Sequence, residues 1–240
     1  ANSAEIINSD SRKYLSYNEG IYVGYRYYET RYEDTVLSRG NADSDAGVYA
    51  SSGNKWKYKE EVQFPFGHGL SYSEFEQKLD SLKVDWNNKT ATATVTVTNK
   101  STSRAGKDVV QIYAQAPYTE GGIEKSAVQL CGFAKTDVLE PGKSQTLMVD
   151  IELRDIASYD ENTYKTYILE DGDYYFAIGD NAHDALNNIL ASKGKSVADG
   201  MDEKGDAKKA SKQKKSSFNK DEYRLSATNR SITNQFDTAD

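Results

Sequence analysis

The middle of the chain alternates apolar and polar residues in short runs, and this alternation predicts β-strands. From Thr90 to Thr98 every second residue is alanine or valine, and the residues between them are threonines. From Leu147 to Leu153 leucine, valine and isoleucine again occupy every second position. Successive side chains of a strand point to opposite faces, so each run predicts a strand with one buried and one exposed face.

Turn residues separate these runs from further strand candidates. Glu170-Asp-Gly-Asp173 predicts a hairpin turn, and Glu140-Pro-Gly-Lys143 predicts the turn that precedes the Leu147–Leu153 strand. About seven short strands within roughly 100 residues are typical of an immunoglobulin-like β-sandwich. Residues 81–181 are therefore expected to form one. The further predicted strands are 108–115, 128–133, 164–169 and 174–178.

The first 80 residues have aromatic runs and few regular elements. Ile21–Tyr28 has the composition of a strand, and Gly24 within it permits close approach of another backbone. The polar segment Asn41–Lys59 is expected to be a surface loop. Phe64–Gly69 predicts a rigid turn, because its proline fixes φ and its glycines permit left-handed conformations. This region is interpreted as the end of a domain whose beginning is absent.

The alternation ends after Asp180. Residues 182–193 carry one short apolar stripe, which predicts a helix. Residues 195–217 are rich in lysine and poor in apolar side chains, so burial cannot offset the entropy of ordering and a disordered linker is expected. The tail regains apolar residues that could dock onto the sandwich or onto an absent part: Phe218, Tyr223, Leu225, Ile232 and Phe236.

Charge and apolar content narrow the range of partners. The formal net charge of −7 argues against nucleic acid, since phosphate binding needs a basic face. No apolar stretch reaches the ~20 residues that cross a membrane, so a soluble chain without a transmembrane segment is expected. The single cysteine, Cys131, excludes an internal disulfide, and its apolar neighbours predict a buried structural thiol.

Taken in order, several motifs resemble one enzyme family. Glu19–Tyr28 and Phe64–Tyr72 are similar to the end of the α/β sandwich domain of family 3 glycoside hydrolases of the β-glucosidase type. His68 stands where tyrosine is more usual, which alters a turn and no known chemistry. The resemblance implies a mainly β chain, in which the C-terminal part of an α/β domain (1–80) precedes a fibronectin type III-like sandwich (81–181). The motifs similar to that module are Val95–Asn99, Ala105–Tyr113, Leu130–Phe133, Leu139–Gly142 and Leu153–Tyr159.

Three further segments resemble a bacterial subgroup of this family in which the domain order is permuted. They are Arg31–Leu37, His183–Leu190 and Ile232–Asp237. In that subgroup the α/β domain and the module precede the catalytic barrel. The resemblance therefore implies that residues 182–240 form a short helix, a lysine-rich linker and a flexible tail that lead toward an absent barrel.

The resemblance also implies where the catalytic groups of such an enzyme lie. A retaining glycosidase uses one carboxylate as nucleophile and a second carboxyl group as acid/base, ~5 Å apart. The family's nucleophile lies in a Ser-Asp-Trp-like motif of the barrel and its acid/base in a Gly-Glu-Gly-like loop, and neither is found in this sequence. Glu19 is followed by glycine, but its family context is structural. No catalytic residue is therefore assigned to this chain.

The remaining candidate site residues are expected to lie at the surface or to form no site. The adjacent pairs Glu33-Asp34 and Glu60-Glu61 are expected to be solvated, because their side chains would diverge in a strand. Trp56 and Tyr58 are weak candidates for stacking on a sugar, if their loop lines an active-site mouth and is not an ordinary exposed loop. No metal or cofactor is expected: the aspartates 171, 173, 180 and 184 miss the calcium-loop spacing, and His68, His183 and Cys131 make no local zinc set.

These observations favour a non-catalytic portion of a β-glucosidase-like enzyme that completes the α/β domain and supports the barrel. The parent enzyme would hydrolyse terminal β-glycosidic bonds with retention, and its partners would be the barrel and, through it, a carbohydrate. Two alternatives remain open: a free-standing carbohydrate-binding or adhesion module with a row of exposed aromatic residues, and a scaffold for a separately encoded catalytic chain. An exposed apolar patch around Phe64–Phe75 would favour a supporting role over the binding module.

Overall fold

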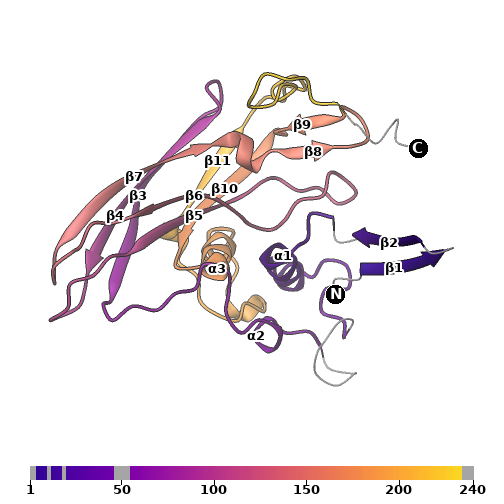
Figure 1. Ribbon diagram of the computed structural model, residues 1–240. Helices are drawn as coiled ribbons and strands as arrows, with labels where there is room; N and C mark the ends of the chain where they lie inside the picture. Colours follow the sequence, from indigo (N-terminus) through magenta and orange to yellow (C-terminus); the bar gives the residue numbers. More distant parts are fainter. Residues whose placement is uncertain (1–3, 10–11, 18–19, 46–54, 234–240) are drawn as a thin grey trace.

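The computed structural model describes residues 4–9, 12–17, 20–45 and 55–233 (Figure 1). Its central part is a sandwich of two antiparallel sheets, one of three strands in the order β3-β4-β7 and one of four in the order β11-β10-β5-β6. The mainly β, immunoglobulin-like fold class predicted from the sequence is confirmed. The sandwich strands are β3 (Phe75–Asp85), β4 (Thr90–Asn99), β5 (Val109–Gln115), β6 (Gln129–Lys135), β7 (Ser144–Glu152), β10 (Gly172–Gly179) and β11 (Ala210–Lys215).

Helices and two small hairpins complete the described residues. Helix α1 contacts α3, and α3 contacts β10, so these helices cover the outer face of the four-stranded sheet (Figure 1). We call α1, α2, α3 and residues 201–206 the helical layer. The helices are α1 (Tyr25–Val36), α2 (Tyr58–Glu61) and α3 (Ala182–Ser192), and the hairpins pair β1 (Ala4–Ser9) with β2 (Arg12–Tyr17) and β8 (Ser158–Asp160) with β9 (Thr166–Ile168).

Strand β4 shows how the alternation builds the sandwich core. Val95 and Val97 are fully buried between the sheets, whereas the threonines between them face outward. On the outer face the hydroxyl groups of Thr96 and Thr146 lie 2.9 Å apart across β4 and β7. Cys131 of β6 is buried in the same core, and burial raises the pKa of its thiol, as expected for a structural cysteine.

The four-stranded sheet is buried on both faces. On β10, Phe176 and Ile178 point into the sandwich core, while Ala177 between them points to the helical layer. On β5, Ile112 faces the sandwich and Tyr113 faces the helices. The sheet therefore separates two cores, one between the sheets and one beneath the helices.

The prediction of a strand over Ile21–Tyr28 is wrong, because α1 begins at Tyr25. Tyr32 and Val36, further along the helix, are buried beneath the helical layer. The strand prediction rested on the β-propensity of the tyrosines, and packing of α1 against α3 outweighs that local preference. Gly24 precedes the helix at a φ of 60°, a conformation that favours glycine.

The prediction of a disordered linker over residues 195–217 is also wrong, because this segment contains β11. The strand pairs with β10 from Ala210 to Lys215. Lys212 and Lys214 face solvent, and Lys215 is buried with its ammonium group 3.3 Å from a carboxylate oxygen of Glu222. The backbone hydrogen bonds of a sheet edge offset the ordering entropy that apolar burial alone would not.

The prediction of a short helix after Asp180 is confirmed by α3. The tail docks onto the sandwich, as one alternative proposed: Tyr223 is buried in its core and Phe218 packs against Tyr164. Phe236 lies outside the described residues. Among the helices that are described, none is both long and apolar enough to cross a membrane.

Candidate functional site

Trp56 and Tyr58, the weak candidates for stacking on a sugar, are not exposed. Their exposed fractions are 3% and 5%, because the segment folds back onto α1. The Arg31 guanidinium lies 4.8 Å from the centre of the Trp56 ring. Tyr58 begins α2 and stacks on the imidazole of His183 at 3.7 Å between ring centres. The prediction of an exposed polar loop fails for these two residues, which belong to the core of the helical layer.

A buried polar network holds the helical layer together. His183, in the first turn of α3, has one ring nitrogen 2.9 Å from Glu29 of α1 and the other 2.9 Å from Asp202. The Tyr58 hydroxyl donates a hydrogen bond to Glu29. The Tyr32 hydroxyl accepts a hydrogen bond from the Asp202 amide at 2.9 Å. The network therefore joins α1, α2, α3 and residues 201–206 through one imidazole.

The position of His183 between two carboxyl groups favours its protonated form. Burial alone lowers the pKa of His183, but hydrogen bonds to Asp202 and Glu29 outweigh this effect and raise the pKa to about 9. Burial tends to raise the pKa of Asp202, and the hydrogen bond from His183 reverses the direction, so this pKa is lowered. A protonated imidazole donates from both nitrogens, which matches the two carboxyl partners.

The acidic pairs differ from the solvated surface predicted for them. Glu33 is buried, with its carboxylate 2.9 Å from the ammonium group of Lys193 and 3.0 Å from the Gln115 amide nitrogen. The prediction assumed a strand, whereas α1 turns Glu33 toward β5 and α3. Glu60 does face solvent, in agreement with the prediction, and forms a 2.9 Å ion pair with Lys57.

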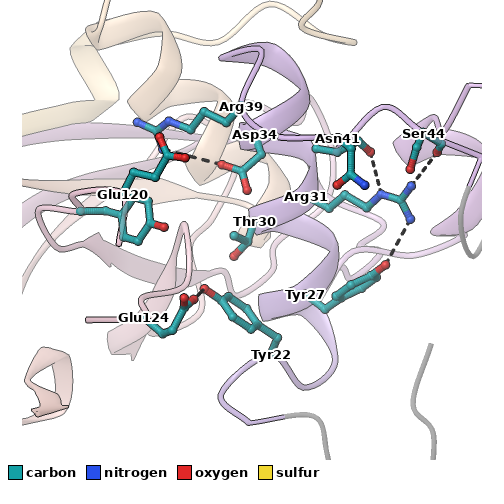
Figure 2. A pocket seen from close by; sticks show the side chains of 13 residues that line it. Tyr22, Tyr27, Thr30, Arg31, Asp34, Arg39, Asn41, Ser44, Glu120 and Glu124 are labelled. Carbon is teal, nitrogen blue, oxygen red and sulfur yellow. Dashed lines mark hydrogen bonds and ion pairs between the residues drawn. The ribbon is translucent and has the colours of Figure 1, made fainter. Parts of the chain in front are cut away.

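A recess of about 640 Å³ lies beside α1. Figure 2 shows Thr30 and Asp34 on the side of α1 that faces Glu120 and Glu124, which belong to the loop between β5 and β6. The wall of the recess combines aromatic rings, carboxyl groups and guanidinium groups. Its lining residues are Tyr22, Tyr27, Thr30, Arg31, Asp34, Arg39, Gly40, Asn41, Ala42, Ser44, Tyr118, Glu120 and Glu124.

Contacts among these residues fix several of the polar groups. The Tyr22 hydroxyl donates to Glu124, and Arg39 lies 3.7 Å from Asp34 and 5.7 Å from the centre of the Tyr118 ring. Burial, together with the charge of neighbouring Glu33, raises the pKa of Asp34 to about 6, although Arg39 opposes the shift. At neutral pH the Asp34 carboxylate is therefore mostly ionised.

The groups considered for a metal site have other roles. Asp173 forms a 2.7 Å ion pair with Lys212, and Asp184 accepts a hydrogen bond from the Asp180 amide. The His68 ring stacks on Phe64 in the predicted turn, far in sequence from His183. Over residues 20–45 and 55–233, no three His, Cys, Asp or Glu side chains are grouped to hold a metal ion. Glu19 lies outside the described residues, so the absence of a catalytic carboxylate in this chain stays a prediction.

No local pattern in the sequence indicates the recess, because its two walls are remote in the chain. Tyr22 and Glu124 are 102 residues apart, and no local spacing joins them. Prediction of a helix over Tyr25–Val36 would have identified one of the two walls. Thr30 and Asp34 are four residues apart and so share one helical face.

The comparisons with known proteins agree with this architecture. Residues 108–182 match the model of the fibronectin type III-like domain. The sandwich is therefore of the fibronectin type III-like class. The chain corresponds to the region of family 3 glycoside hydrolases of the β-glucosidase type that contains this domain. The resemblance to this family read from the motifs is thereby confirmed, whereas the permuted domain order stays a prediction.

Individual relatives show how much of such an enzyme the chain represents. It is 37% identical over 182 residues to a β-glucosidase of Ruminococcus albus, covering 74% of this chain and 16% of the relative. With β-glucosidase A of Butyrivibrio fibrisolvens it shares 36% over 191 residues, covering 71% and 19%. The crystal structure of a Paenibacillus barengoltzii β-glucosidase superimposes with a TM-score of 0.53 at 35% identity, covering 69% and 16%. The chain thus spans less than a fifth of the length of these relatives.

Proposed function

We propose that this chain is a non-catalytic portion of a β-glucosidase-like glycoside hydrolase and that it supports the catalytic domains of that enzyme. The parent enzyme hydrolyses terminal β-glycosidic bonds with retention. The name β-glucosidase of the relatives supports the type of bond, and the family resemblance implies retention. The catalytic barrel is the partner, either covalently attached or in trans. The carbohydrate substrate is bound by the parent enzyme.

One exposed apolar surface carries this proposal. Leu70 and Tyr72, in the segment just before β3, are each 92% exposed. Tyr25 stacks on Phe66 with ring centres 4.4 Å apart, which places the segment before α1 next to the Phe64–Tyr72 segment. Large exposed apolar side chains gathered on neighbouring segments are typical of a surface that another domain covers. We call this set the apolar surface: Ile21, Val23, Phe64, Phe66, Leu70 and Tyr72.

The alternative of a free-standing carbohydrate-binding or adhesion module receives less support. It predicted a row of exposed aromatic residues on one sandwich face. On the described sandwich and its β8–β9 hairpin, the exposed aromatic residues within strands are Phe133 of β6 and Tyr167 of β9, which belong to different sheets. They do not form a row.

A chimera tests the supporting role. The region of the Ruminococcus albus β-glucosidase that aligns with this chain is replaced by the chain, and hydrolysis of 4-nitrophenyl β-glucoside is measured. We expect activity from the chimera and none from the chain alone. Burial of one leucine contributes about 1.5–3 kcal/mol, so Leu70→Asp should reduce assembled, active enzyme by about tenfold or more.

Met148→Asp is the matched control, because Met148 is an equally apolar, exposed residue on β7, outside the apolar surface. It should leave the activity of the chimera within about twofold. Equal losses from the two substitutions would contradict the proposed docking surface. Hydrolysis by the chain alone would overturn the proposal that it is non-catalytic.

A further inference from the structure

The recess beside α1 has the size and the lining of a saccharide site, and we propose that it binds a neutral sugar. Its volume of about 640 Å³ falls within the range of small-molecule sites, roughly 300–1,000 Å³. The apolar surface of the supporting role consists of other residues, although two of them, Ile21 and Val23, flank Tyr22 of the recess in the sequence. The two proposals therefore stand or fall separately.

Tyrosine rings supply the apolar part of the site. Tyr22 and Tyr27 come from α1 and the segment before it, and Tyr118 comes from the loop between β5 and β6. A tyrosine offers an apolar ring face and a polar hydroxyl. A sugar ring has the same division, with C–H groups on its faces and hydroxyl groups around its edge. The rings can therefore pack on the sugar while its edge meets the polar groups.

The polar groups of the recess select a neutral ligand rich in hydroxyl groups. Asp34, Glu120 and Glu124 provide three carboxyl groups, and Arg31 and Arg39 provide two guanidinium groups. A carboxylate only accepts hydrogen bonds and a guanidinium only donates them, whereas a hydroxyl group does both. The three carboxyl groups repel an anion. An amine would use the carboxylates but would face two guanidinium groups of like charge.

Several of the polar groups are already held in place, which lowers the entropic cost of binding. The Arg31 guanidinium donates to the backbone oxygens of Ala42 at 2.8 Å and Ser44 at 2.7 Å. It also lies 3.1 Å from the Tyr27 hydroxyl (Figure 2). These contacts leave the side chain little freedom to lose when a ligand binds.

A second cavity adjoins the recess and shares part of its wall, which gives room beside the first sugar unit for a second one. This cavity has a volume of about 330 Å³ and leads toward Gln115 and Lys193. A second sugar unit there would meet the buried polar groups that surround Glu33. The two cavities share the lining residues Tyr22, Thr30, Asp34, Arg39 and Tyr118.

Binding is tested on the 240-residue chain by titration calorimetry and by saturation-transfer NMR with glucose and cellobiose. Glucuronate and putrescine serve as the anionic and cationic probes. We expect a Kd on the order of 1 mM for glucose, a lower Kd for cellobiose and much weaker binding of both charged probes. Tyr118→Ala should weaken sugar binding by about tenfold or more, and Tyr72→Ala, an exposed tyrosine outside the recess, should not change it.

Glu124→Gln keeps the shape of its side chain and provides a second variant if Tyr118→Ala fails to fold. It should weaken glucose binding by about threefold to tenfold at an unchanged unfolding midpoint. Absence of saturable sugar binding up to about 50 mM would overturn the proposal. So would tighter binding of glucuronate or putrescine, or equal losses in Tyr118→Ala and Tyr72→Ala. Every arm uses the chain without a catalytic domain, so failure here leaves the supporting role untouched.

Discussion

The two cores of this molecule are built on different principles. The sandwich core is mainly apolar, with side chains such as Val95, Ile112 and Phe176 fully buried between the sheets. The helical layer packs apolar residues around a charged centre, in which Glu29 is fully buried and bonded to His183. Apolar burial is insensitive to pH, whereas a buried ion pair depends on the protonation of both partners. The two halves of one chain should therefore respond differently to mutation and to pH.

The two tryptophans allow each core to be followed separately. Trp56 lies in the core of the helical layer, and Trp86 packs against the sandwich core, 5.1 Å from the ring centre of Tyr174. Trp86→Phe leaves a chain whose fluorescence reports on the helical layer. Trp56→Phe leaves a chain that reports on the sandwich.

The largest expected effect comes from Phe176→Ala in the sandwich. Removal of a fully buried phenylalanine costs about 3–5 kcal/mol of unfolding free energy, a large share of what an ordinary domain has. Because the helical layer packs on the same sheet, we expect both tryptophan signals to shift to lower urea concentration together. A Trp56 signal that remains at its original midpoint while Trp86 unfolds early would show that the layer is independent of the sandwich.

The next effect is a loss of stability of the helical layer as the pH rises. The pKa of His183 is about 9 in the folded protein, whereas an unperturbed histidine, as in the unfolded chain, has a pKa of 6.5. Between pH 6.5 and pH 9 the folded state therefore binds one more proton than the unfolded state. This stabilisation is complete below pH 6.5 and disappears as the pH passes 9, a change of about 3 kcal/mol. Burial raises the pKa values of Tyr32 and Tyr58, so their hydroxyl groups stay protonated in this window.

Urea unfolding from pH 6 to pH 10 measures this dependence on the chain whose remaining tryptophan is Trp56. The midpoint should fall with pH in the parent chain. His183→Gln cannot gain or lose the proton, and its midpoint should be lower at pH 6 and nearly independent of pH up to 9. A parent chain with a flat profile would contradict the assignment of a protonated His183.

The smallest effect is expected from an exposed ion pair at the edge of the same layer. Lys59 and Glu203 lie 3.0 Å apart and are both more than half exposed. Exposed pairs contribute little, so Lys59→Ala should change the unfolding free energy by no more than about 0.5 kcal/mol. A loss above about 1 kcal/mol would mean that charge at the surface, and not only at the buried centre, stabilises this layer.

The two regions also differ in how much of them the sequence predicts. The sandwich strands follow from period-two alternation, since each half-buried strand carries its own pattern, as in Thr90–Thr98. The helical layer does not follow from local pattern, because its partners are far apart in the chain. Glu29 meets His183 across 154 residues, and Tyr22 meets Glu124 across 102. Local propensity accordingly assigned a strand to Ile21–Tyr28, where α1 begins, and an exposed loop to Trp56.

Lysine content misled the prediction for β11 in a different way. The composition of residues 195–217 correctly indicates that apolar side chains are few. It contains no information on the free edge of β10, with which this segment pairs. The edge of β10 satisfies the backbone of Ala210–Lys215, and Glu222 neutralises the buried Lys215. Ordering of such a segment depends on its neighbour and not on its own residues.

The return of the chain from α3 to β11 sets a practical limit on shortened versions of this protein. A truncation that kept only the matched residues 108–182 would discard β3 and β4 at one end and β11 at the other. Without β11, the backbone of β10 becomes an unprotected edge that can pair with another molecule. Such fragments should self-associate. A soluble minimal unit must therefore extend to at least Lys215, well beyond the boundary of the recognised module.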